Sequence, residues 1–184
     1  MSSDEKKNMV ADDEQVARIV SHEWVIDGEL QLAASALAPR ETYLSVNRPV
    51  IDTYDEDVLQ FVSSHPNYLG ENKQSYKRAL LEVKGVRAIS VVKDGMRLNV
   101  NVEVEPRDSH TMSHAGIFVR VEGKNVVLGK QLPEGQLPYN VSEEYLLQQV
   151  QWELLELAEL QECRVLNEKE VPFQTDEFGR VSLE

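Results

Sequence analysis

Apolar and polar residues alternate most regularly over residues 96–105. The apolar positions are Met96, Leu98, Val100, Val102 and Val104, and each is followed by a polar residue. A period of two predicts a β-strand with one buried and one solvent-exposed face. Asp94-Gly95 comes just before it, and this dipeptide favours a tight turn with positive φ. We therefore expect a hairpin between 86–93 and 96–105, with 96–105 in the interior of a sheet.

The longest helical pattern runs from Ser142, a suitable N-cap, to about Glu162. Its apolar stripe contains Leu147, Val150, Leu154 and Leu157, and we expect this stripe to pack on the apolar face of 96–105. Tyr145 and Trp152 fall outside the stripe and, with Leu155, would form a second apolar strip. Two such strips favour a helix between the sheet and a partner subunit, or a deeply buried helix in a monomer. We treat Tyr145 and Trp152 as interface candidates.

The remaining periodic segments are shorter. We expect a first regular element over 16–26, a hairpin at Asp27-Gly28, a strand over 43–48 ended by Pro49, and a strand that begins at Ile117. Helices are predicted from Asp55 to the His65-Pro66 pair and over 71–83. The pattern as a whole predicts an α+β fold with a mainly antiparallel sheet and two or three helices packed on one face. We expect a flexible acidic tail over 1–14 and a single domain over 15–184, of which 166–184 is irregular.

Charge narrows the classes of partner. The chain has 32 acidic and 19 basic residues, a net charge of −13, and most of the excess lies in residues 1–14 and 141–184. Such a balance excludes a general nucleic-acid binder and docking on anionic membranes. An acidic end can keep the protein soluble or meet a basic protein partner. The polar N-terminal residues, the single cysteine and the lack of a long apolar run predict a cytoplasmic protein.

The loop 107–114 holds the densest cluster of reactive side chains. His110 and His114 are four residues apart and Asp108 is close. On a helix this spacing would suit a metal site, but the pair lies between two predicted strands, so we predict no metal site. The three residues remain candidates for acid–base catalysis. Ser45, Ser109 and Ser113 could serve as nucleophiles, although none lies in a glycine-flanked elbow and turn hydrogen bonds explain them as well.

Arginines in the nearly neutral middle of the chain are candidates for binding an anion. Arg48 and Arg107, together with Ser45, are the residues we single out. The alternative is that these arginines neutralise the protein's own carboxylates. The nine glycines are scattered and form no loop that could cradle a phosphate, so the sequence predicts no cofactor.

Two stretches carry a resemblance to known sequences. One is residues 36–40 leading into 44–48, and the other is residues 86–89 leading through Pro106 to 113–117. Together they resemble small uncharacterised bacterial proteins. The resemblance implies a bacterial origin and draws attention to Arg48 and His114, but it implies no reaction.

Two functions remain open on these patterns. The first is a non-enzymatic protein-interaction module or homodimer, because no catalytic signature is present and the last helix has two apolar sides. The alternative is a small enzyme or an anionic-ligand-binding protein with a pocket near the loop 107–114.

Overall fold

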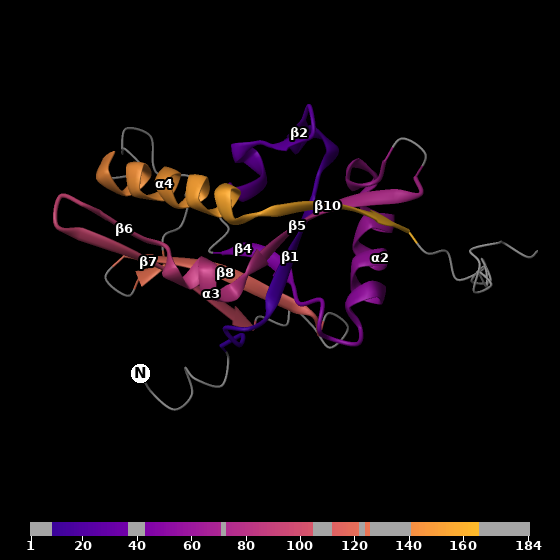
Figure 1. The fold of residues 1–184 in the computed structure, drawn as a ribbon, viewed down its shortest axis with the longest axis horizontal. Helices are drawn as coiled ribbons and strands as arrows, with labels where there is room; N and C mark the ends of the chain where they lie inside the picture. The colour runs from indigo at the N-terminus through magenta and orange to yellow at the C-terminus, as the bar shows by residue number, and fades with distance from the viewer. Residues whose placement is uncertain are drawn as a thin grey trace, which may run out of the picture.

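A curved antiparallel sheet dominates the computed structural model, which describes residues 9–36, 43–70, 73–104, 112–121, 124–125 and 141–165 (Figure 1). Its strand order is β10-β5-β1-β4-β8-β7-β6, and the short β9 pairs with β8. The strands are β1 (Gln15–Val20), β4 (Leu44–Asn47), β5 (Ser75–Glu82), β6 (Ser90–Lys93), β7 (Met96–Val104), β8 (His114–Val121), β9 (Lys124–Asn125) and β10 (Glu159–Arg164). A separate hairpin consists of β2 (Val25–Ile26) and β3 (Glu29–Leu30).

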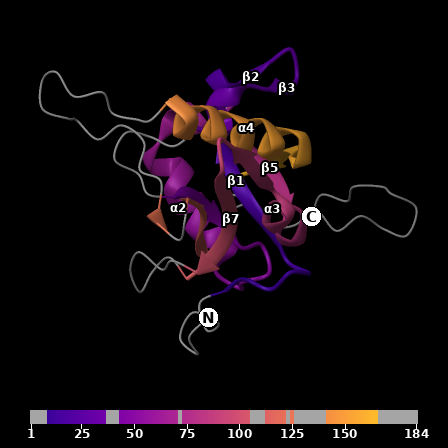
Figure 2. The same ribbon diagram turned by 90° about the vertical axis from the view of Figure 1, so that its left-hand side faces the viewer.

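Three α-helices accompany the sheet in the described residues: α2 (Tyr54–Ser64), α3 (Val83–Ala88) and α4 (Val141–Leu157). Short 3₁₀ turns lie at η1 (His22–Trp24), η2 (Leu32–Ser35) and η3 (Pro66–Tyr68). The predicted α+β class with a mainly antiparallel sheet is therefore confirmed. Figure 2 shows the β2–β3 hairpin projecting beyond α4. No described helix is both long and apolar enough to cross a membrane.

The main core lies between β7 and α4, as the alternating pattern predicts. β7 has β8 on one side and β6 on the other, and its apolar residues Leu98, Val100 and Val102 are buried. They belong to one cluster with residues of α4, namely Leu146, Leu147, Val150 and Leu154. The prediction that Leu157 belongs to this buried stripe was wrong, because its side chain is 42% exposed at the end of the helix.

Both predicted Asp-Gly hairpins are present. Asp94 and Gly95 have φ values of 52° and 79°, and Asp27 and Gly28 have φ values of 52° and 85°. Two successive residues with positive φ match the twist of the flanking strands. Lys93 faces Met96 in the first hairpin and Ile26 faces Glu29 in the second.

α2 covers the other face of the sheet. Its residues Tyr54, Val58 and Val62 pack with β1 and β5 residues in a second cluster, whereas α3 and α4 contribute to the first. Thr53 precedes the helix, and the first turn carries Asp55, Glu56 and Asp57, where the helix dipole favours negative charge. The sheet is thus covered on both faces around β1 and β5.

Several predicted boundaries or types were wrong, among them the strand expected to begin at Ile117, which begins at His114. Residues 71–83 were expected to form a helix, but Ser75–Glu82 is the strand β5. Tyr76 and Leu80 have helical spacing, yet Ala79 and Leu81 are buried too, because this strand has apolar neighbours on both faces. The predicted strand 86–93 begins as helix α3 and becomes β6 only at Ser90. The last helix ends at Leu157, and its predicted final turn is β10.

The N-terminal segment lies on the sheet from Met9 onward, which differs from the tail predicted over 1–14. Met9 forms an antiparallel bridge with Glu103, and the Val10 amide donates to the Val102 carbonyl at 3.2 Å. Val10 is buried in the main core. Residues 1–8 and 166–184 lie outside the described residues.

Candidate functional site

Ser45 and His114, two of the candidates from the sequence, are in direct contact. β4 and β8 pair so that Ser45 faces Gly116 and Asn47 faces His114, and alternate residues of each strand share one face. The Ser45 Oγ is 2.7 Å from the His114 Nε2. A serine hydroxyl beside an imidazole is the arrangement in which histidine can take the hydroxyl proton.

The Tyr43 ring lies beside His114 and packs in turn against Phe118. The Tyr43 ring centroid lies 5.9 Å from that of His114 and 5.0 Å from that of Phe118. Gly116 makes this packing possible, since a Cβ at that position would lie 2.7 Å from the Tyr43 Cδ2 and 2.8 Å from the Phe118 Cε2. His114 is only 5% exposed, so its imidazole is buried in the protein.

A second polar group joins the start of β8 to α2. The buried carboxylate of Asp57 accepts three hydrogen bonds at Oδ2, from the Ser113 amide at 3.0 Å, the Ser113 hydroxyl at 2.6 Å and the Thr53 hydroxyl at 3.1 Å. The Asn47 side-chain amide donates to the Ser113 Oγ at 3.0 Å. Ser113 is fully buried. These bonds satisfy a buried carboxylate and fix the turn before β8.

Arg48 contacts a carboxylate of the protein itself. Its Nε and one terminal nitrogen each donate to Glu14, both at 2.9 Å. The hydrogen bond from Arg48 is the main reason that the pKa of Glu14 is lowered, and burial opposes it. This bidentate pair places the Arg48 guanidinium against β1 and matches the alternative that the arginines neutralise the protein's own acids.

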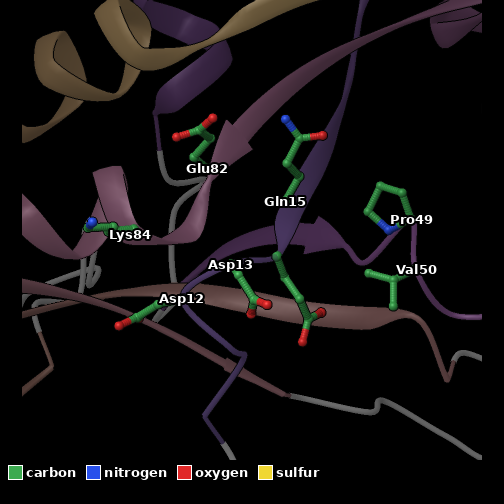
Figure 3. Close-up of a pocket in the computed structure, with 8 residues that line it drawn as sticks. Asp12, Asp13, Gln15, Pro49, Val50, Glu82 and Lys84 are labelled. Carbon is green, nitrogen blue, oxygen red and sulfur yellow. The ribbon is translucent and has the colours of Figure 1, made fainter.

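An open hollow of about 630 Å³ lies beside this ion pair (Figure 3). Its lining residues are Asp12, Asp13, Glu14, Gln15, Pro49, Val50, Glu82 and Lys84. Figure 3 shows Pro49 and Val50 on one side and Lys84 on the other. Arg48 and Arg87 already pair with two of the four carboxylates. Neither Ser45 nor His114 lines this hollow, so it does not open the Ser–His pair to a substrate.

The outer side of α4 presents large exposed aromatic side chains. Trp152 is 54% exposed and Tyr145 is 43% exposed. The Lys93 ammonium lies 3.7 Å from the Tyr145 ring centroid, so a cation covers part of that ring. Leu155, the third member of the predicted second strip, packs partly against the sheet instead. We call Tyr145, Gln149, Trp152 and Glu156 the outer strip, since they follow one another at helical spacing.

Several sequence candidates cannot be placed. Arg107, Asp108, Ser109 and His110 lie outside the described residues. Within the described part of the chain, no three histidine, cysteine or carboxylate side chains converge as metal ligands would. Sequence reasoning missed Asp57, which looks like one more acid of a helix N-terminus, and Glu14, which seemed part of a charged tail.

No protein-family model, curated protein or solved structure matches the chain. The function must therefore be argued from the residues and contacts of this chain.

Proposed function

We propose that this protein is an interaction module that binds a basic segment of another protein along the outer strip of α4. The observation that supports it most directly is the exposure of Trp152, 54% of whose surface faces solvent in the middle of the longest described helix. Trp and Tyr are the residue types most enriched among the side chains that dominate protein–protein binding.

The surroundings of Trp152 favour a basic partner. α4 contains four glutamates and neither lysine nor arginine. Glu153 and Glu156 are exposed beside Trp152, one residue away and one turn away. An apolar centre with a charged rim is typical of a binding surface. A second copy of α4 packed on the strip would bring like charges together, whereas lysines or arginines would complement them.

Geometry sets the size of the contact. Tyr145 and Trp152 are two helical turns apart, about 10 Å along the axis. A partner helix or extended segment with two apolar side chains at that spacing could cover both rings. Truncation of a tryptophan anchor of this kind removes about 2 kcal/mol or more of binding free energy.

The probe for this proposal is a synthetic amphipathic peptide of leucine and lysine, with a leucine–glutamate peptide of the same pattern as its charge control. In a Trp24→Phe background the fluorescence reports Trp152 alone, because the chain has two tryptophans. We expect the lysine peptide to shift the emission to shorter wavelength with saturation, and the glutamate peptide to leave it unchanged.

Two variants make the test specific to the strip. Glu153→Lys combined with Glu156→Lys should weaken binding of the lysine peptide at least tenfold, while Gln148→Ala, on the same helix, should not, as measured by titration calorimetry. The proposal is wrong if the lysine peptide binds no more tightly than the glutamate peptide and does not change the Trp152 emission.

A second candidate function rests on the 2.7 Å contact between Ser45 and His114. Here Ser45 is the nucleophile of an acyl-transfer reaction: His114 takes the hydroxyl proton on Nε2 as the Oγ attacks a carbonyl carbon, and it returns that proton to the leaving group as the bond from the carbonyl carbon to that group breaks. Treatment with a fluorophosphonate should then phosphonylate Ser45 with loss of fluoride, as read by peptide mass spectrometry. Ser45→Ala should abolish the adduct, whereas Ser90→Ala, at an exposed position of β6, should retain it. An unmodified wild-type protein would exclude this candidate.

A further inference from the structure

The described sheet ends at β6 on one side and at β10 on the other. β7 extends beyond β6, and there its edge is covered by Met9, Val10 and the side chain of Arg87. β10 is the terminal strand at the opposite end and pairs, among the described strands, with β5 alone. An uncovered edge strand offers main-chain N–H and C=O groups to another strand.

Hydrogen bonds show which residues of β10 direct these groups outward. The Val165 amide donates to the Gln74 carbonyl at 2.8 Å, so it points toward β5. Ser75 of β5 faces Arg164, but its carbonyl accepts from the Gly70 amide and therefore points away from β10. In an antiparallel pair such bonding alternates along the strand. The main-chain groups of Cys163 and Val165 therefore point to β5, and those of Glu162 and Arg164 point away from the sheet.

We infer that β10 pairs with β10 of a second copy, antiparallel and centred on Cys163, to form a homodimer with one continuous sheet. A two-fold axis perpendicular to the sheet keeps each face continuous, so the strand must be centred on a residue and not between two residues. The inference concerns a different surface from the outer strip of α4 and does not depend on it.

Charge selects the centre. With Cys163 at the axis, Glu162 lies opposite Arg164 of the second copy, twice by symmetry, and Gln161 lies opposite Val165. With Glu162 at the axis the two Glu162 carboxylates would face each other, and with Gln161 at the axis no acid would face a base. Opposite charges stabilise a cross-strand pair, and like charges destabilise it.

Main-chain hydrogen bonding agrees with the same centre. Glu162 and Arg164 direct their N–H and C=O groups outward, so each Glu162–Arg164 pair can exchange two hydrogen bonds across the interface. Cys163 then occupies a non-hydrogen-bonded pair, in which the Cα atoms are about 4.5 Å apart. That separation suits a disulfide, and Cys163 is a half-buried free thiol.

Helix α2 leaves room for this contact. α2 packs on Ala17 and Ile19 of β1 and on Tyr76 and Leu80 of β5, so its axis lies about two strand spacings, roughly 10 Å, from the proposed two-fold axis. Two copies of α2 would then be about 20 Å apart, well beyond the 8–10 Å of packed helices.

The register can be read with single-cysteine variants of the full chain. Diamide takes two electrons and two protons from two thiols and leaves one disulfide. We expect it to convert the wild type to a species of twice 20.9 kDa on non-reducing gels. The matched control is Cys163→Ala with Gln161→Cys, which keeps Glu162 and Arg164 in place and should cross-link at least tenfold more slowly, since residues 161 of the two copies are four residues apart along the strands in this register. Equal or reversed rates would overturn the register.

Sedimentation equilibrium tests the pairing without a cross-link. At about 0.15 M salt, where charges more than about 8 Å apart are screened, we expect a reversible dimer. Arg164→Glu should weaken it about tenfold or more, and adding Glu162→Arg should restore it. Circular dichroism checks that each variant is folded, and Trp152→Ala should leave the dimer unchanged. A monomeric wild type throughout the concentration series, or a double variant without rescue, would refute the inference.

Discussion

The guanidinium of Arg87 donates a hydrogen bond to the main-chain carbonyl of Val102 at 2.9 Å, where β7 has already passed the end of β6. The same terminal nitrogen donates to the Val10 carbonyl at 2.6 Å, and the Nε donates to the Asn101 side chain at 3.0 Å. Another terminal nitrogen pairs with Asp12. One side chain of α3 thus fastens residues 9–12 to an open strand edge.

Arg87→Ala should destabilise the protein by about 2–3 kcal/mol, because the Val10 and Val102 carbonyls each lose a hydrogen bond from a charged donor. Urea denaturation measures the loss, and Arg97→Ala, at an exposed position of β7, is the control that should change stability little. Amide hydrogen exchange should also speed up over residues 9–12. Unchanged exchange there would mean that Arg87 does not hold the segment.

Val100→Asp should unfold the protein, while Asn99→Asp should be tolerated. Val100 is 5% exposed in the cluster shared with α4, and a buried carboxylate without a partner costs several kcal/mol. Asn99 is exposed on the other face of β7 and lies opposite Arg120. Thermal melts followed by circular dichroism rank the two variants, and the reverse ranking would contradict the register of β7.

Asp57→Ala should destabilise the fold by about 2–4 kcal/mol, because it leaves buried donors of Ser113 without an acceptor. Asp57→Asn, which retains a side-chain oxygen, should cost less. Asp55→Ala in the same helical turn is an exposed control. The free energies of unfolding come from urea titrations, and equal losses for Asp57→Ala and Asp55→Ala would show that the three hydrogen bonds contribute little.

Glu14→Gln should lower stability near neutral pH but not in acid. The pKa of Glu14 is lowered in the folded protein by the hydrogen bond from Arg48. A lowered folded-state pKa adds stability above the unfolded value, about 4.3 for glutamate, and that stability is lost as the pH falls through the folded value. The effect should be no more than about 1 kcal/mol, since solvent screens the pair.

The check is the difference in unfolding free energy between wild type and Glu14→Gln over a pH series. The difference should be constant at pH 6–8. It should shrink as the pH falls below the pKa of glutamate in the unfolded chain, about 4.3. Asp13→Asn is the control for net charge, because it removes one negative charge at an exposed neighbouring residue. If the difference did not depend on pH, the titration of Glu14 would not control the contribution of the Arg48 contact, and the prediction would be wrong.

Local signals in the sequence predicted the central hairpin well. Asp94-Gly95 needs positive φ at both residues, and the alternation over 96–105 is strict, so turn and strand indicate the same structure. β5 is different because its apolar residues serve two cores: Tyr76 and Leu80 face α2, while Leu81 faces the main cluster. A strand that is buried on both faces loses its period of two, and the remaining spacing resembled a helix.

The candidate site was less accessible to sequence reasoning. Ser45 and His114 were singled out separately, but their contact depends on the pairing of strands that lie far apart in the chain. Asp57 carried no signal, since an acid at a helix start is common, and Ser113 was singled out only as a candidate nucleophile and not as a partner of Asp57. Glu14 became recognisable only when the register of β1 placed it against Arg48.

The position of β5 has a consequence for biosynthesis. Its neighbours in the sheet are β1 and β10, the first and the last of the described strands in chain order. A chain emerging from the ribosome can pair β5 with β1 early, but the other edge of β5 stays open until residues 159–164 have been made. During that interval the unpaired edge of a strand that carries Ala79, Leu80 and Leu81 is available to other nascent chains. We expect molecules stopped before residue 159 to aggregate during synthesis rather than accumulate as a smaller folded protein.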